Sequence, residues 1–283
     1  MSSEGLPQPD SILGAPHPRD TPRLIGQSAA EADFLDAYRT GRLHHGWLMI
    51  GPRGTGKATL AYRIARFLLS QPVNESAMFG APDAPTTLDT DPNHPVAHRM
   101  AAGAEPGLFV LKRGGAGSTE SDQQKNFEAG KFASEIRVSD VRKLKNFFAM
   151  SSADGGRRVV IVDAADDMNV NAANAILKLL EEPPERATLL LVSHQPSRLL
   201  PTIRSRCREL RLSPLSDADM STALQQALPG ADLDQGALAA LTSGSVGEAI
   251  RMTNLSGPAM YSELVGLFAS LPRMDRSRAM SRA

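Results

Sequence analysis

A glycine-rich loop between an apolar run and an amphipathic helix constrains the fold of this chain more than any other feature. The apolar run Trp47–Ile50 leads directly into the loop Gly51-Pro52-Arg53-Gly54-Thr55-Gly56-Lys57. Beyond the loop, residues 57–70 carry apolar side chains at helical spacing, which predicts a helix that starts at Lys57. A strand, a glycine loop and a helix in this order provide the context in which a loop can hold a phosphate group.

The same alternation of apolar runs and helical stretches continues to residue 212. Further apolar runs occupy 108–111, 159–162 and 189–192, residues 209–212 are a candidate fifth strand, and helical patterns occupy 138–150 and 170–182. Asn169 is a plausible cap for the second of these helices, and Pro183-Pro184 is expected to end it. The run 159–162 is apolar throughout, as expected for a strand buried on both faces. The alternation predicts an α/β fold with a parallel five-stranded sheet and helices on both faces.

The pattern predicts four regions along the chain. They are a flexible tail (1–22), a sheet domain (23–214), a helical lid (215–256) and the start of a further helix or a tail (257–283). The tail is expected to be flexible because it is rich in proline. Residues 71–107 and 114–131 interrupt the sheet domain, and structureless loops of this length are uncommon inside compact domains. We therefore expect mobile surface insertions at both places.

The composition excludes several kinds of site. The formal net charge is zero, so the chain as a whole is not built to grip nucleic acid. The single cysteine, Cys207, excludes a disulfide framework and a cysteine-cluster zinc site, and it favours a cytoplasmic location. No stretch approaches the ~18 apolar residues of a membrane helix. His94 and His98 stand one helical turn apart, but no further ligand lies nearby, so we expect no metal site.

The glycine loop fits the phosphate-loop pattern up to its last position. The candidate nucleotide contacts are Gly51, Gly54, Thr55, Gly56 and Lys57, together with Asp163 at the end of the apolar run 159–162. Backbone N–H groups of such a loop surround phosphate oxygens, and an acid at the end of a neighbouring strand helps to hold Mg²⁺. Ala58 replaces the Ser or Thr whose hydroxyl also holds Mg²⁺. The loop therefore either binds nucleotide weakly or keeps only the shape, and a plain glycine turn is a third reading.

Longer strings connect the chain to a known family. Residues 171–184 read NAANAILKLLEEPP, 200–207 read LPTIRSRC, 24–27 read LIGQ and 42–47 read RLHHGW. Over roughly residues 23–254 the chain resembles the clamp-loader subunits of the AAA+ class, and it is similar to the delta-prime branch found in bacterial DNA polymerase III. The Ser-Arg-Cys string with its lead-in makes this resemblance far more specific than the glycine loop alone.

The resemblance implies roles for individual residues. Arg206, in the Ser-Arg-Cys string, would be an arginine finger that reaches the γ-phosphate of ATP held by a neighbouring subunit. Ala164 stands where hydrolysing members carry the glutamate that activates water, and Gly247 stands where active members carry a lid arginine. Ser193 and His194 occupy the place of the first sensor. Arg251 lies one helical turn beyond Gly247 and could substitute in part, but we do not expect it to replace the arginine.

The resemblance also implies a function. We expect a non-hydrolysing, stator-like subunit of the DNA polymerase III clamp-loader complex, with no catalysis of its own, no required cofactor and at most weak ATP binding. Its partners would be the ATP-hydrolysing loader subunits and the delta subunit, with the sliding clamp and primed DNA reached through the assembly. The four-cysteine zinc module and most of the collar domain of the family are not expected in this chain. An active ATPase and a small-molecule kinase are the alternatives.

Overall fold

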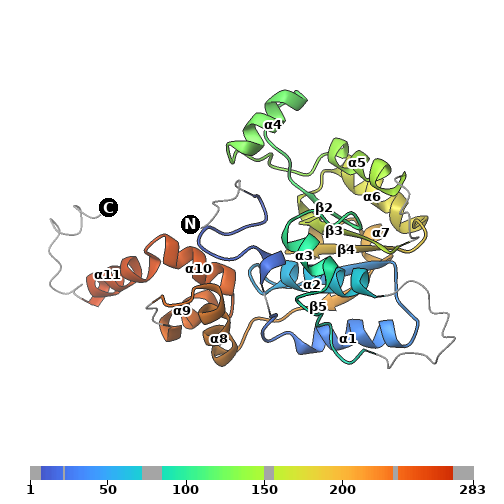
Figure 1. Ribbon diagram of the computed structural model, residues 1–283. Coiled ribbons are helices and arrows are strands. Elements are labelled where there is room, and N and C mark those ends of the chain that lie inside the picture. The colour runs from blue at the N-terminus through green and yellow to red at the C-terminus, as the bar shows by residue number, and fades with distance from the viewer. Residues whose placement is uncertain (1–7, 22, 72–84, 150–155, 232–234, 270–283) are drawn as a thin grey trace.

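The computed structural model describes residues 8–21, 23–71, 85–149, 156–231 and 235–269. Its centre is a parallel five-stranded sheet with the strand order β2-β3-β4-β1-β5. The strands are β1 (Gly46–Ile50), β2 (Leu108–Lys112), β3 (Arg158–Asp163), β4 (Ala187–Ser193) and β5 (Arg208–Arg211). The predicted α/β fold class and the predicted parallel sheet are confirmed (Figure 1).

Helices cover both faces of the sheet. On one face lie α1 (Ser28–Arg39) and α2 (Lys57–Ser70), and on the other lie α5 (Val138–Ala149) and α6 (Val170–Glu181), with the short α7 (Pro201–Arg204) beyond them. Alternate residues of one strand enter opposite cores, because successive side chains of a strand point to opposite faces. Val159 and Ile161 pack under α2, whereas Val160 and Val162 pack under α5 and α6. The predicted cap is confirmed, since the Asn169 side chain accepts the N–H of Ala172.

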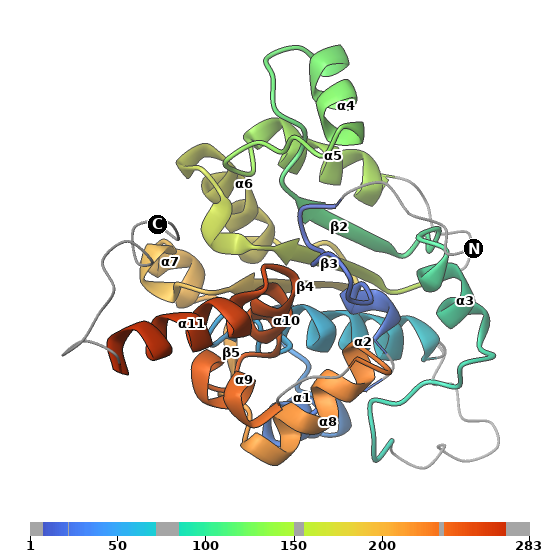
Figure 2. The ribbon, with the colours of Figure 1, turned by 90° about the vertical axis from the view of Figure 1, so that its left-hand side faces the viewer.

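The two interruptions of the sheet domain contain helices in the parts that the structure describes. In 71–107, α3 (Pro95–Ala101) buries Val96 and Met100 in the core beneath α2. In 114–131, α4 (Glu120–Glu128) buries no residue and projects from the domain (Figures 1 and 2). The expectation of a surface insertion is therefore wrong for α3, which is part of the core, whereas α4 does lie on the surface. A proline at the first helical position starts α3, and Thr119 caps α4, so short helices form despite the loop-like composition.

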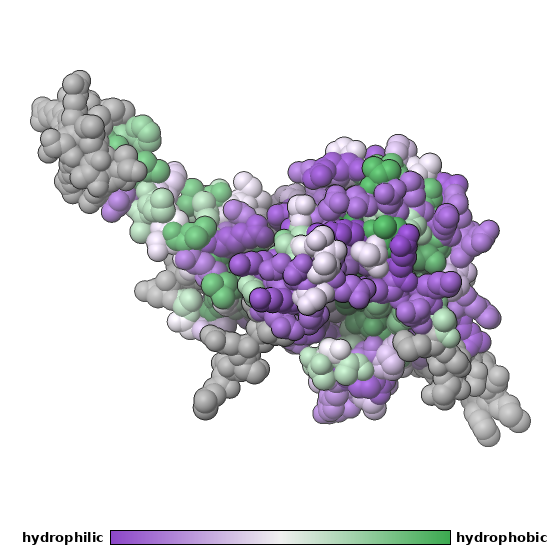
Figure 3. Space-filling model, turned by 90° about the horizontal axis from the view of Figure 1, so that it is seen from above, coloured by the Kyte–Doolittle hydropathy of each residue, from purple (hydrophilic) through white to green (hydrophobic). Residues whose placement is uncertain are grey.

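The lid packs around a core of its own. It comprises α8 (Asp217–Ala227), α9 (Gln235–Thr242) and α10 (Val246–Asn254), with Met220, Leu224 and Leu238 fully buried among them. The next helix, α11 (Gly257–Ala269), extends away from the lid and buries none of its residues. Apolar side chains lie along this projecting part (Figure 3). Within the described ranges, no helix has the length and apolarity needed to cross a membrane.

Residues 8–21, here called the N-terminal arm, pack against the body of the molecule. The arm passes between the lid and the sheet domain and includes a turn of 3-10 helix at Pro18–Asp20 (Figure 1). The expectation of a flexible tail is wrong for this stretch, and residues 1–7 lie outside the described part. The composition hid the packing because buried anchors, above all the ion-paired Asp10, lie between the prolines.

Candidate functional site

The glycine loop joins β1 to α2 at the carboxyl edge of the sheet. Gly51, Gly54 and Gly56 all have positive φ angles, of 151°, 76° and 95°. At Gly51 a Cβ atom would lie 2.3 Å from the Leu212 carbonyl oxygen, so a larger residue cannot occupy this turn without moving the backbone. The sequence therefore specifies glycine here for steric reasons as well as for the curl of a phosphate loop.

Gln27 holds the loop from behind. The side chain is buried, and its Nε2 donates to the carbonyls of Thr55 at 3.2 Å and Ser213 at 2.8 Å. Its Oε1 accepts the N–H of Ser213 at 3.2 Å. One amide thus ties the glycine loop to the chain that leaves β5. In the sequence, Gln27 stands out only as the last residue of the string LIGQ. Because Gln27 is far from the glycine loop along the chain, no local pattern predicts that it supports the loop.

Lys57 is turned into its own loop. Its side chain is buried, and Nζ donates to the Gly51 carbonyl at 2.7 Å and to the Pro52 carbonyl. Burial lowers the pKa of Lys57 to about 8, and this effect outweighs the opposing attraction of Asp163. The ammonium group remains charged at neutral pH, with two carbonyl oxygens as partners.

Asp163 ends β3 beside the loop. Burial, and after it the nearby charge of Asp10, raise its pKa to about 7 against the opposing charges of Lys57 and Lys112. Lys112 is its register partner on β2. The carboxylate of Asp10 comes from the N-terminal arm, whose composition predicts a flexible tail. The structure therefore adds an acidic residue to the candidate site that the motifs did not reveal.

A second acid, Asp166, lies next to the two sensor candidates. Its Oδ1 accepts the backbone N–H of His194 at 2.9 Å. Burial lowers the pKa of His194 to about 4, so the imidazole is neutral at physiological pH. The Ser193 Oγ and His194 Nδ1 atoms are buried and have no hydrogen-bond partner among the residues that the structure describes. The structure brings both residues to the same edge as the glycine loop, because Ser193 is paired with Ile50 in the sheet.

The lid touches the glycine loop directly. The Gly247 N–H donates to the Gly54 carbonyl at 3.2 Å, and the Ser245 hydroxyl donates to the Arg53 carbonyl at 2.8 Å. A Cβ atom on Gly247 would lie 2.8 Å from the Gly54 Cα. There is no room for the lid arginine of active family members in this arrangement. Arg251 lies 3.6 Å from Glu248 in an exposed ion pair.

A cavity of about 270 Å³ remains between the loop, the lid and the N-terminal arm. Ligand pockets for small molecules commonly measure roughly 300–1,000 Å³. Ala58 and Ala164 both border this cavity, and neither side chain offers an oxygen atom to Mg²⁺ or to an attacking water. The curled loop keeps the shape of a phosphate site, but the residues present do not fit a hydrolytic Mg²⁺–nucleotide centre.

Arg206 lies at the other end of the sheet. It stands between α7 and β5, and its backbone carbonyl borders Gly46 at the start of β1. The glycine loop begins where β1 ends, and five residues of strand at about 3.3 Å each put roughly 16 Å between the two places. The guanidinium is about two-fifths exposed; its Nη2 lies 2.9 Å from Glu181 Oε1, and its Nη1 donates to the Thr202 carbonyl at 3.1 Å. The structure therefore separates Arg206 from the other candidate site residues.

His94 and Cys207, the remaining residues singled out from the sequence, lie in environments that do not favour chemistry. His94 Nδ1 accepts the N–H of Val96 and so caps α3. Among the described residues, no group of three or more His, Cys, Asp and Glu side chains could hold a metal ion. Cys207 is partly buried, and burial raises the pKa of its thiol to about 12. This thiol is therefore not a nucleophile at neutral pH.

Comparison with known proteins agrees with these motifs. The family described as "DNA polymerase III, delta subunit" matches residues 26–216. Over 186 residues the chain is 40% identical to DNA polymerase III subunit delta' of Pseudomonas aeruginosa, a match that covers 65% of this chain and 48% of that protein. Over 222 residues it is 31% identical to the Escherichia coli K12 subunit delta', covering 77% and 57%. The chain thus spans about half the length of these curated relatives.

A similar solved structure is the DNA polymerase III gamma subunit-related protein from Thermotoga maritima. It is 20% identical, with a TM-score of 0.44, and the match covers 87% of this chain and 64% of that chain.

Proposed function

The chain belongs to the DNA polymerase III delta-subunit family, and from this premise we propose that it is a non-hydrolysing, stator-like subunit of a clamp-loader complex. The observation that carries the proposal is the separation between Arg206 and the chain's own glycine loop. An arginine at the amino end of the strands cannot serve a phosphate at their carboxyl end. Its exposed guanidinium can meet a phosphate that another subunit holds, which supports the proposal.

The chemistry of an arginine finger fits this surface. A guanidinium carries a permanent charge and presents a fork of N–H donors that matches phosphate oxygens. In other phosphoryl-transfer systems a finger supplied in trans is worth about 10³–10⁵ in rate. The exposed ion pair with Glu181 is of the weak surface type, so a phosphate can replace the carboxylate at small cost.

The chain's own cleft supports the non-hydrolysing half of the proposal. Ala58, Ala164 and Gly247 remove the Mg²⁺ hydroxyl, the general base and the lid arginine at three separate places. General-base catalysis alone typically contributes ~10²–10⁴-fold. ATP-hydrolysing loader subunits and the delta subunit are the proposed partners, and the sliding clamp and primed DNA are proposed to be handled by the whole assembly.

The experiment measures clamp- and DNA-stimulated ATP turnover by the reconstituted loader that contains this chain. Wild type is compared with Arg206→Ala and Arg206→Lys, and the chain alone serves as control. From the size of finger effects elsewhere, we expect a loss on the order of 100-fold or more at the site that the finger serves for the alanine variant. Lysine should cause a partial loss, because it keeps the charge but not the fork. Turnover by the chain alone, or no change in either variant, would contradict the proposal and favour the active-ATPase alternative.

A further inference from the structure

The N-terminal arm is fixed to the sheet domain by charge and by ring packing. Asp10 is almost fully buried, and its Oδ1 lies 2.8 Å from Lys112 Nζ while its Oδ2 lies 3.3 Å from His17 Nε2. Burial opposes the charge of Asp10, but the neighbouring His17 imidazole and the charge of Lys112 hold its pKa at about 2. His17 in turn packs edge-on against Tyr62 of α2, with ring centroids 5.6 Å apart.

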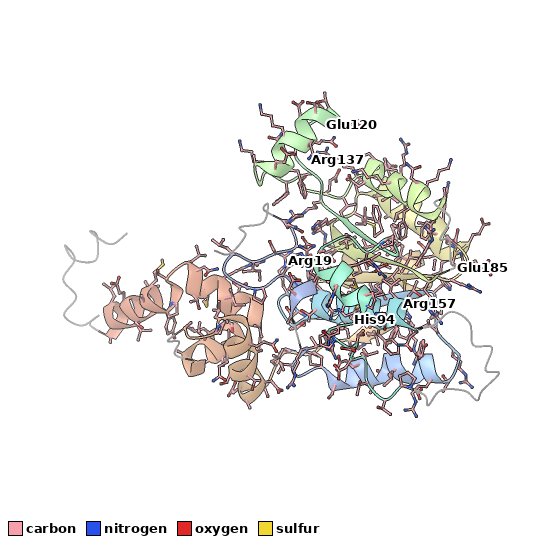
Figure 4. All side chains as sticks on the ribbon, in the orientation of Figure 1. Arg19, His94, Glu120, Arg137, Arg157 and Glu185 are labelled. Carbon is pink, nitrogen blue, oxygen red and sulfur yellow. The ribbon has the colours of Figure 1, made fainter. Side chains whose placement is uncertain are left out.

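Backbone contacts continue this attachment along the arm. The Arg66 side chain on α2 donates to the Arg19 carbonyl at 2.5 Å. The Arg19 side chain itself lies where the arm meets α2 and α3 (Figure 4). The arm is therefore held over α2, the helix that the glycine loop opens.

The same arm is also fixed to the lid. The Asn254 side chain of α10 donates to the Leu13 carbonyl at 2.6 Å. Ile12 and Ala15 pack against the apolar core of the lid, and the Ile12 Cδ1 atom reaches to 3.2 Å from the Cβ position of Gly247. The neighbouring Leu13 side chain points to solvent and is 86% exposed. Adjacent residues of the arm thus have opposite environments.

Between these two anchors the arm borders the phosphate loop. Pro9, Asp10, Ile12, Ala15 and Pro16 line the cavity together with the loop and with α10. Lys112, the cation that faces Asp163 across the β2–β3 pair, is neutralised by Asp10. The arm therefore contributes an apolar wall and a carboxylate to the lining of the cleft beside the glycine loop.

We propose that the N-terminal arm is a built-in ligand of this cleft, which takes the place of nucleotide and holds the lid on the phosphate loop. The arm makes contacts of the kinds that a bound nucleotide makes: an anion on a cation of the sheet domain and an apolar group against the lid. Because it belongs to the same chain, its effective concentration is high and independent of the surrounding solution. A nucleotide must displace it before the loop can be occupied.

The inference does not depend on the role of Arg206, and it is tested with the isolated chain. Binding of a fluorescent ATP analogue with Mg²⁺ is titrated for wild type, Ile12→Ser, Asp10→Asn and the matched control Leu13→Ser. Amide hydrogen exchange of α10 is followed in the same samples, and far-UV circular dichroism confirms folding. Since the arm competes as an intramolecular ligand, we expect binding tighter by about fivefold or more and α10 exchange faster by about tenfold or more for Ile12→Ser and Asp10→Asn. Leu13→Ser should be unchanged in both.

Three outcomes would overturn the proposal. The first is nucleotide binding that is equal, or undetectable, in all four proteins. The second is a gain in binding for Leu13→Ser as large as that for Ile12→Ser, because the effect would then not come from the cleft. The third is faster exchange of α10 without tighter binding, because the arm would then be a structural strut that does not compete with nucleotide.

Discussion

The carboxylate of Glu181 lies 2.9 Å from the guanidinium of Arg206 on the surface at the amino ends of the strands. Glu181 is the last residue of α6, and Arg206 stands between α7 and β5, so the ion pair joins two connections of the sheet domain. Both side chains are about two-fifths exposed. The pair therefore orients Arg206 toward the surface but contributes little to stability.

Replacing Glu181 tests whether the pair only restrains the arginine. For Glu181→Gln we expect a stability change within about 0.5 kcal/mol and loader ATP turnover within about threefold of wild type. The physical reason is that the Thr202 carbonyl still accepts one hydrogen bond from Arg206. Chemical denaturation and the reconstituted turnover assay provide the two measurements. A loss as large as that of Arg206→Ala would mean that Glu181 is itself needed to position the arginine.

Adding one methyl group to Gly247 tests the contact between lid and loop. Alanine normally stabilises a helix by about 1 kcal/mol relative to glycine. At Gly247 the new Cβ would lie 2.8 Å from the Gly54 Cα, so we expect Gly247→Ala to destabilise the chain by about 1–3 kcal/mol instead. Gly266→Ala is the matched control, because no other part of the described chain lies within 4 Å of its Cβ position on α11. Opposite signs of the two changes in urea unfolding would confirm the contact, and equal signs would contradict it.

Removing the Gln27 side chain tests the support of the glycine loop. Gln27→Ala leaves the Thr55 and Ser213 carbonyls without their buried donor, and we expect a loss of about 2–4 kcal/mol in unfolding free energy. Gln124→Ala is the control, because the Gln124 amide donates to exposed Glu128 on α4. Its expected effect stays within about 0.5 kcal/mol. If both variants unfold alike, Gln27 does not stabilise the loop.

The pH dependence of stability should reveal two groups, Asp163 and His194, whose titration changes the unfolding free energy in opposite directions. The pKa of Asp163 rises from 3.8 to about 7, so the folded chain binds the extra proton and this contribution to stability is lost as pH rises across that range. The pKa of His194 falls from 6.5 to about 4, so its contribution is lost as pH falls across that range. Between these values the two effects oppose each other in the wild type.

Single variants separate these effects. We expect the stability of Asp163→Asn, relative to wild type, to rise as the pH rises from 3.8 to about 7. The stability of His194→Asn, relative to wild type, should fall as the pH rises from about 4 to 6.5. Each change should be on the order of 1–3 kcal/mol, allowing for partial solvent screening. Urea unfolding at closely spaced pH values measures both, and parallel curves for all three proteins would show that neither pKa is shifted.

Local sequence signals predicted several regular elements closely. The helix Lys57–Ser70 has the bounds that its apolar spacing predicts, and the helix Val170–Glu181 ends one residue before its predicted end. Gly56 precedes the first helix, and Asn169 caps the second by accepting the N–H of Ala172. Where a start signal and a strong helical period coincide, residues close in sequence are enough to fix an element.

Local sequence signals could not predict the contacts that define the cleft. Asp10 meets Lys112, and Gln27 meets Ser213, across long stretches of chain, and no local pattern encodes either pairing. The contact of Gly247 was not predicted either. The sequence predicts only that Gly247 lacks the arginine of active family members, and the structure shows that the backbone of the glycine loop leaves no space for a side chain there. Proline content misled the prediction for the arm, because an extended segment with a few buried anchors has the composition of a disordered one.

The contact between Gly54 and Gly247 has a geometric consequence. Because backbone atoms meet there, the lid can come no closer to the sheet domain at this point. The lid carries α11 on one side, and Arg206 lies at the far end of the sheet. The contact therefore limits how near a surface that binds α11 can lie to one that meets Arg206.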